Sequence, residues 1–114
     1  MSEPREPVEV AILGGGPGGY VAALEAARRG ASVVLIEKEK LGGTCLNVGC
    51  IPTKVLTTSA ELLTQARGAA EFGLSIPRAG VDLPGLMAFK EKTVEQLVAG
   101  VEQLLRARKV RIVR

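Results

Sequence analysis

Five glycines and one proline close to the N-terminus constrain the fold of this 114-residue chain more than any other segment. The cluster consists of Gly14, Gly15, Gly16, Pro17, Gly18 and Gly19. It follows an aliphatic run over 8–13 that predicts a buried strand, and it precedes a helical pattern that Gly30 ends. A second aliphatic run over 31–36 predicts another strand. The order strand, glycine turn, helix and strand favours a parallel sheet with a helix packed against it.

The spacing of Gly14, Gly16 and Gly19 matches the pattern G-x-G-x-x-G. The first glycine permits the turn, the second lets a pyrophosphate approach the backbone, and the third lets helix and strand touch. Glu37 ends the second predicted strand, where a carboxylate can accept hydrogen bonds from ribose hydroxyls. These features predict a Rossmann-like βαβ unit that binds a dinucleotide. An ordinary glycine turn beside a solvated Glu37 is the alternative, and the turn alone does not separate FAD from NAD.

The rest of the chain predicts more helix than strand. We expect a helix over 45–67 with Pro52 near its start, a loop over 68–80, and a long helix capped by Asp82. Its apolar face is predicted to comprise Leu86, Val94, Leu97, Val98, Val101, Leu104 and Leu105. A last strand over 110–113 needs a neighbour, so we expect 8–114 to be part of an incomplete α/β domain. Aromatic residues are 3% of the chain, which suits an α/β core and not a stacking surface for nucleic acid.

Charge and chain ends suggest no nucleic-acid or membrane partner. The net charge is +3, and the basic residues near the C-terminus suit a solvated helix end: Arg106, Arg108, Lys109, Arg111 and Arg114. Residues 1–7 are polar and predict a flexible tail, not a signal peptide. The apolar runs are shorter than the ~20 residues that cross a bilayer, so we expect a cytoplasmic chain. A close cysteine pair in that reducing compartment is more typical of catalysis than of structure.

Cys45 and Cys50 are five residues apart at the start of the second predicted helix. An ideal helix would separate their Cα atoms by roughly 8 to 9 Å, whereas disulfides usually need less than ~7 Å. We therefore expect Gly49 and Pro52 to distort the helix, and a helix N-terminus to lower the pKa of a nearby thiol. Zinc is disfavoured, because two cysteines without any histidine leave its tetrahedral set two ligands short. On spacing alone, redox function and two inert buried cysteines stay equally open.

The segment that contains both cysteines reads GGTCLNVGCIPTK over 42–54. It resembles the redox signature of the class I pyridine nucleotide-disulfide oxidoreductases, which follows the FAD-binding βαβ unit in that family. Leu46, Ile51 and Thr53 resemble the variant in dihydrolipoamide dehydrogenases more than those in glutathione or mercuric reductases. The predicted helix and strand over 81–113 resemble the same group, so the likeness covers nearly the whole chain.

The resemblance implies a role for each candidate site residue. The turn from Gly14 to Gly19 would hold the FAD pyrophosphate, and Glu37 with Lys38 would bind the adenosine. Gly43 and Thr44 would lie on the flavin side of the cofactor. The resemblance makes Cys45 the thiol that exchanges with substrate and Cys50 the thiol beside the flavin. Lys54, otherwise an ordinary exposed helix lysine, would place its ammonium near the flavin.

The implied reaction passes two electrons from dihydrolipoamide to the cysteine pair, then to FAD and NAD. Expected partners are a lipoyl domain or a small dithiol, and a second copy in a homodimer of the complete enzyme. The family uses a histidine as acid-base for the exchanging thiol, and this chain has none. It also has no second glycine turn for NAD and no interface domain. Two alternatives stay open: a stand-alone module that binds FAD without turnover, and a fragment with glutathione or mercuric ion as substrate.

Overall fold

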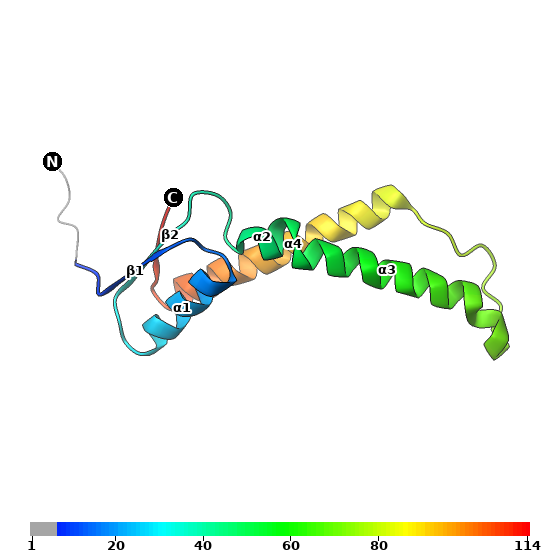
Figure 1. Ribbon diagram of the computed structural model, residues 1–114, viewed down its shortest axis with the longest axis horizontal. Helices are drawn as coiled ribbons and strands as arrows, with labels where there is room; N and C mark the ends of the chain where they lie inside the picture. The colour runs from blue at the N-terminus through cyan, green and yellow to red at the C-terminus, as the bar shows by residue number, and fades with distance from the viewer. Residues whose placement is uncertain (1–6) are drawn as a thin grey trace.

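The computed structural model describes residues 7–114 and contains eight elements (Figure 1). The predicted tail over 1–7 lies, except for Pro7, outside the described residues. In chain order the elements are β1 (Val10–Leu13), α1 (Pro17–Arg28), β2 (Val33–Ile36), α2 (Gly43–Val48), α3 (Cys50–Gly68), the 3-10 helix η1 (Ala69–Phe72), α4 (Leu83–Ala107) and β3 (Arg111–Val113).

The three strands form one parallel sheet in the order β1-β2-β3. Val10 pairs with Val33 and Leu13 with Ile36, while Ile36 also pairs with Val113 on the other side. Helix α1 connects β1 to β2, and helices α2, α3, η1 and α4 lie between β2 and β3 in the chain (Figure 1). The predicted α/β class, with parallel strands and flanking helices, is confirmed.

The core lies where α1 and α4 meet the sheet. Strand β2 is the central strand, and Leu35 is fully buried, as are Ala23 of α1 and Leu105 of α4. Strand β1 alternates between half-buried and exposed residues because successive side chains point to opposite faces of the sheet, and Leu13 is 82% exposed. This small core holds the glycine turn and the end of β2 against each other.

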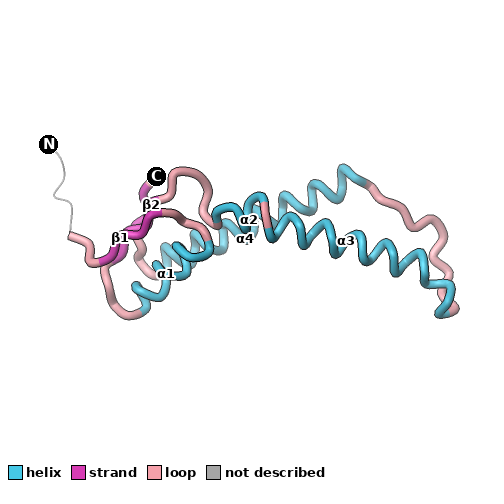
Figure 2. The backbone as a smooth tube through the Cα atoms, in the orientation of Figure 1, coloured by secondary structure: helices cyan, strands magenta, loops and turns pink. Residues whose placement is uncertain are grey.

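Helices α3 and α4 extend from this core as a long hairpin (Figure 2). The chain measures 70 × 29 × 18 Å along its principal axes, and the hairpin accounts for the longest of them. Val94, Val101 and Leu105 of α4 are buried as predicted. Leu97 and Leu104 are 42% and 57% exposed, so the buried face of α4 is narrower than the sequence pattern suggested. Within the described part of the chain, no helix has the length and apolar composition to cross a membrane.

Several predicted boundaries were wrong by a few residues. The strands begin at Val10, Val33 and Arg111, because the preceding residues form turns and isolated hydrogen bonds such as Glu9 N–H to Ser32 O. The predicted loop over 68–80 begins with the last residue of α3 and the 3-10 helix η1. Asp82 is the residue before α4, but its side chain makes no capping hydrogen bond; its backbone carbonyl accepts one from Leu86 N–H.

Candidate functional site

The glycine turn joins β1 to α1 at the carboxyl end of the sheet. Gly14 N–H donates to the Ile36 carbonyl at 2.8 Å, and the Gly16 carbonyl accepts the first helical hydrogen bond, from Tyr20 N–H. Pro17 occupies the first position of α1, where its missing N–H removes no hydrogen bond. The turn therefore presents the start of a helix next to the end of β2.

Gly19 packs directly on the backbone of this turn. A Cβ atom at this position would overlap the Gly14 carbonyl oxygen, so the approach of α1 to β1 requires glycine. Within residues 7–114, no acceptor binds the N–H groups of Gly16, Gly18 and Gly19. Backbone N–H groups at a helix N-terminus form an anion site. The turn therefore offers the N–H groups that an anion site needs, and a bound pyrophosphate stays a prediction.

Glu37 faces the glycine turn from the end of β2. Its Oε2 accepts a hydrogen bond from Gly15 N–H at 2.7 Å, and its Oε1 accepts one from Glu39 N–H at 2.8 Å. The hydrogen bonds from Glu39 N–H and then Gly15 N–H hold the pKa of this carboxyl below its ordinary value. Lys38 is exposed and lies 3.8 Å from a Glu39 carboxylate oxygen. The carboxylate thus lies beside the turn in ionised form and keeps lone pairs that can accept further hydrogen bonds.

Glu37→Gln is expected to reduce the acid sensitivity of the ligand-free chain. The folded pKa lies below the ordinary value of about 4.5, so the carboxylate stabilises the fold above that pH. That stability is lost as the pH falls through the folded pKa. Thermal unfolding followed by circular dichroism should show a lower midpoint for the variant at about pH 6, and a smaller decrease on acidification to about pH 3. Equal acid sensitivity in both chains would show that Glu37 does not hold the turn.

The cysteine pair lies where α2 and α3 meet. Gly49, with φ −121° and ψ −106°, separates the two helices, so the single predicted helix over 45–67 is interrupted there. Pro52 lies in the first turn of α3, where Thr53 N–H bonds the Gly49 carbonyl. Because proline has no N–H, it cannot donate to the Val48 carbonyl four residues earlier, as a continuous helix would require. A Cβ on Gly49 would come within 2.9 Å of the Thr44 carbonyl oxygen and 3.4 Å of the Cys45 Cα. The predicted departure from ideal helix therefore occurs at Gly49, three residues before Pro52.

Both thiols are free in the structure, Cys45 half-buried and Cys50 exposed. The pKa of Cys45 is raised, chiefly by its hydrogen bond with the Cys50 thiol and then by partial burial. The Cys50 N–H and the charge of Lys54 act in the opposite direction but do not outweigh these causes. The expectation that a helix N-terminus lowers the pKa was therefore wrong for Cys45 in the dithiol form. The effect of Cys50 on this pKa nevertheless indicates that the two thiols lie close together.

Backbone contacts join the cysteine segment to the glycine turn. Gly42 N–H donates to the Gly15 carbonyl at 2.8 Å, and a Cβ on Gly43 would lie 2.8 Å from the Gly16 Cα. Thr44 is exposed in the first turn of α2, and Lys54 is exposed in α3, four residues beyond Cys50. The structure therefore brings the predicted phosphate site and the predicted thiol site together.

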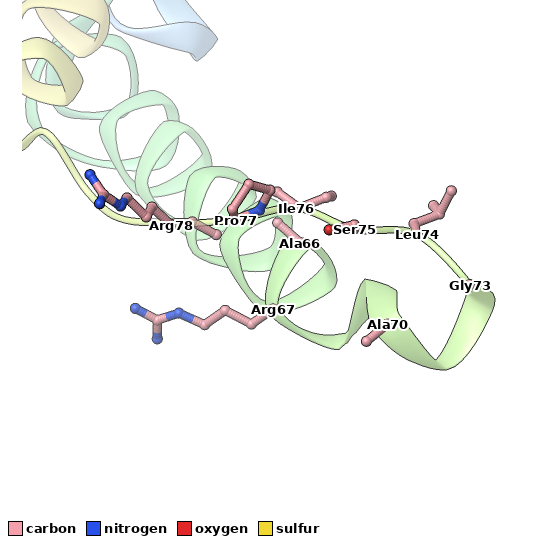
Figure 3. A pocket seen from close by; sticks show the side chains of 10 residues that line it. Ala66, Arg67, Ala70, Gly73, Leu74, Ser75, Ile76, Pro77 and Arg78 are labelled. Carbon is pink, nitrogen blue, oxygen red and sulfur yellow. The ribbon is translucent and has the colours of Figure 1, made fainter.

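A shallow pocket at the far end of the hairpin is separate from this site (Figure 3). It lies where the 73–79 loop passes the end of α3, and it is lined by Ala66, Arg67, Ala70, Gly73, Leu74, Ser75, Ile76, Pro77, Arg78 and Ala79. None of these is a cysteine or a carboxylate. Along α3, its nearest lining residue, Ala66, lies about 24 Å from Cys50 at 1.5 Å per residue. It contains no predicted site residue.

Comparison with known proteins identifies the family. The sequence pattern of the family described as pyridine nucleotide-disulphide oxidoreductase matches residues 8–114. The chain belongs to this family. The resemblance inferred from the segment over 42–54 and the glycine turn is therefore confirmed.

Individual relatives support the same assignment to the pyridine nucleotide-disulphide oxidoreductase family. It is 47% identical over 107 residues to a dihydrolipoyl dehydrogenase of Bacillus subtilis, covering 92% of this chain and 23% of the relative. It is 46% identical to a leghemoglobin reductase of Vigna unguiculata, and the match covers 93% of this chain and 21% of the relative. The crystal structure of LpdA from Mycobacterium tuberculosis superposes with a TM-score of 0.84 at 30% identity, covering 91% of this chain and 22% of that one. The chain thus spans less than a quarter of the length of these proteins.

Proposed function

We propose that this chain holds FAD on its glycine turn and carries the redox-active cysteine pair of a dihydrolipoyl dehydrogenase-like oxidoreductase. The observation that carries the proposal is the contact between the two sites, made by Gly42 N–H on the Gly15 carbonyl. A dinucleotide bound at the helix N-terminus would lie next to the segment that bears the thiols. The names of the relatives support the choice of reaction.

In this proposal the chain's own residues bind and orient the cofactor. The N–H groups of Gly16, Gly18 and Gly19 donate to the pyrophosphate, and the Glu37 carboxylate accepts from the ribose hydroxyls, with Lys38 beside the adenosine. Gly43 and Thr44 flank the flavin side, and Lys54 contributes positive charge near it. When bound, FAD supplies a two-electron acceptor for the dithiol, with NAD as the final acceptor. The region 8–114 is then the N-terminal part of an FAD-binding domain.

The thiol chemistry is a disulfide exchange between Cys45, Cys50 and a dithiol substrate. A thiolate of dihydrolipoamide attacks the Cys45 sulfur of the disulfide and releases the Cys50 thiolate. The second substrate thiolate then attacks the substrate sulfur of the mixed disulfide and releases the Cys45 thiolate. The substrate becomes a cyclic disulfide, and the cysteine pair takes up its two electrons.

The substrate thiols must lose their protons to attack as thiolates, so this exchange needs help with proton transfer. The chain contains no histidine, so we expect the acid-base to come from another part of the enzyme or from a partner subunit. Positioned acid-base groups contribute about 100-fold or more. A homodimer, a lipoyl-domain partner and a cytoplasmic location are further parts of this proposal.

Titration of the purified chain with FAD tests the proposal. We expect flavin absorbance to remain with the protein after gel filtration, and to change when a dithiol is added. A matched Cys50→Ser chain should retain flavin but lose the dithiol response. A chain that retains no flavin at saturating FAD would refute the proposed cofactor. Retained flavin with no dithiol response would instead favour a dinucleotide-binding module without turnover, which the absence of histidine also suggests.

A further inference from the structure

Asn47 lies in α2 between the two cysteines, and no role has been assigned to it so far. Its side-chain amide donates both of its N–H groups: one to the Leu41 carbonyl at 3.0 Å and one to the Gly43 carbonyl at 2.9 Å. Both hydrogen bonds are partly buried. The bond to Leu41 therefore ties the helix of Cys45 to the loop that precedes it, and the bond to Gly43 lies within the first turn of that helix.

That loop is the segment that contacts the glycine turn. Leu41 is 1% exposed, and its side chain lies against Gly15. Gly42 bonds the Gly15 carbonyl, and Gly43 lies against Gly16. The two carbonyl groups that Asn47 binds thus belong to residues in contact with the phosphate site. The Asn47 side chain thus adds a link between the thiol helix and the turn beside these backbone contacts.

We infer that Asn47 is a positioning residue that holds the cysteine helix in one register on the glycine turn. The inference rests on the proposed function, because it explains how the thiols keep their place beside a bound dinucleotide. Two donors are needed for two carbonyl acceptors, and an asparagine amide provides both from one nitrogen. An aspartate of the same shape provides none when it is ionised, and its charge would face two carbonyl oxygens.

The link that Asn47 makes between the cysteine helix and the glycine turn should be detectable in the ligand-free chain. Oxidised glutathione converts the two thiols to a disulfide and is itself reduced to two glutathione molecules. Because Asn47 links the thiol helix to the turn, we expect disulfide formation to shift the amide NMR signals of Gly15 and Gly16. FAD plays no part in this measurement, so its outcome is independent of cofactor binding.

Asn47→Asp is expected to remove most of the shift at Gly15 and Gly16, while mass spectrometry still detects the disulfide. Asn47→Ala removes the donors without adding charge and should give the same loss of shift. It keeps the test usable if the aspartate variant does not fold. Val48→Ala, at an exposed neighbouring position, should keep the parent shift. Leu105→Ala lowers stability by leaving a cavity in the core but removes no hydrogen bond of Asn47, so it should also keep the shift.

Loss of the shift in both Asn47 variants, but not in Leu105→Ala, supports the positioning role and excludes a purely structural one. A full shift in either folded Asn47 variant would overturn the inference. So would an equal loss in Leu105→Ala, since that would attribute the effect to stability. Absence of any shift in the parent chain would also overturn it, because no coupling would then exist for Asn47 to transmit.

Discussion

Gly19→Ala is expected to destabilise the ligand-free chain by about 3 kcal/mol, because an added Cβ overlaps the Gly14 carbonyl oxygen. Backbone atoms cannot move aside as a flexible side chain can. The turn must therefore open, or α1 must move away from β1, and either change weakens the contact of Ala23 with the core. Urea denaturation followed by circular dichroism measures the loss, and FAD retention should be abolished with it.

Gly18→Ala is the matched control for this prediction. Gly18 is the next residue of the same motif towards the N-terminus, but a Cβ there would meet no atom within 4 Å. Since Gly18 lies in the first turn of α1, alanine should leave stability unchanged or raise it by up to about 1 kcal/mol. Equal destabilisation by the two substitutions would show that the close approach at Gly19 does not govern the turn.

The βαβ unit could be predicted from the sequence because its signals are local. Aliphatic runs, glycine spacing and the helix end at Gly30 each lie within a few residues of the structure that they specify. Long-range hydrogen bonds could not be predicted from such local signals. Glu37 was predicted to face a ribose, but its bond to Gly15 N–H joins residues 22 positions apart and depends on the sheet register.

The site was predicted less completely than the fold. Asn47 was missed because its acceptors are backbone carbonyls, which every residue carries, so no sequence pattern marks them. Its spacing of four residues from Gly43 within one helix was the only available signal. The pKa of Cys45 was predicted in the wrong direction because a general rule about helix ends neglected the neighbouring thiol. In both cases the property depends on a contact with particular residues, which the local sequence pattern does not specify.

The segment around Gly49 shows how a local prediction and a contact can agree. The spacing of Cys45 and Cys50 required a departure from ideal helix, and glycine was a natural place for it. The structure adds the reason for glycine in particular, since α3 begins against the Thr44 carbonyl with no room for a side chain. The proximity of the two thiols therefore depends on a missing Cβ atom.

Gly49→Ala is expected to lower the equilibrium constant for forming the Cys45–Cys50 disulfide in glutathione buffers roughly tenfold. The new Cβ would lie 2.9 Å from the Thr44 carbonyl oxygen, so the start of α3 must move away from α2. That movement separates the thiols, whereas Gly68→Ala, at a position of α3 with no atom within 4 Å, should leave the equilibrium unchanged. Alkylation and mass spectrometry give the dithiol fraction, and circular dichroism confirms that both variants are folded. An unchanged equilibrium in a folded Gly49→Ala chain would mean that the thiols reach bonding distance without this close packing.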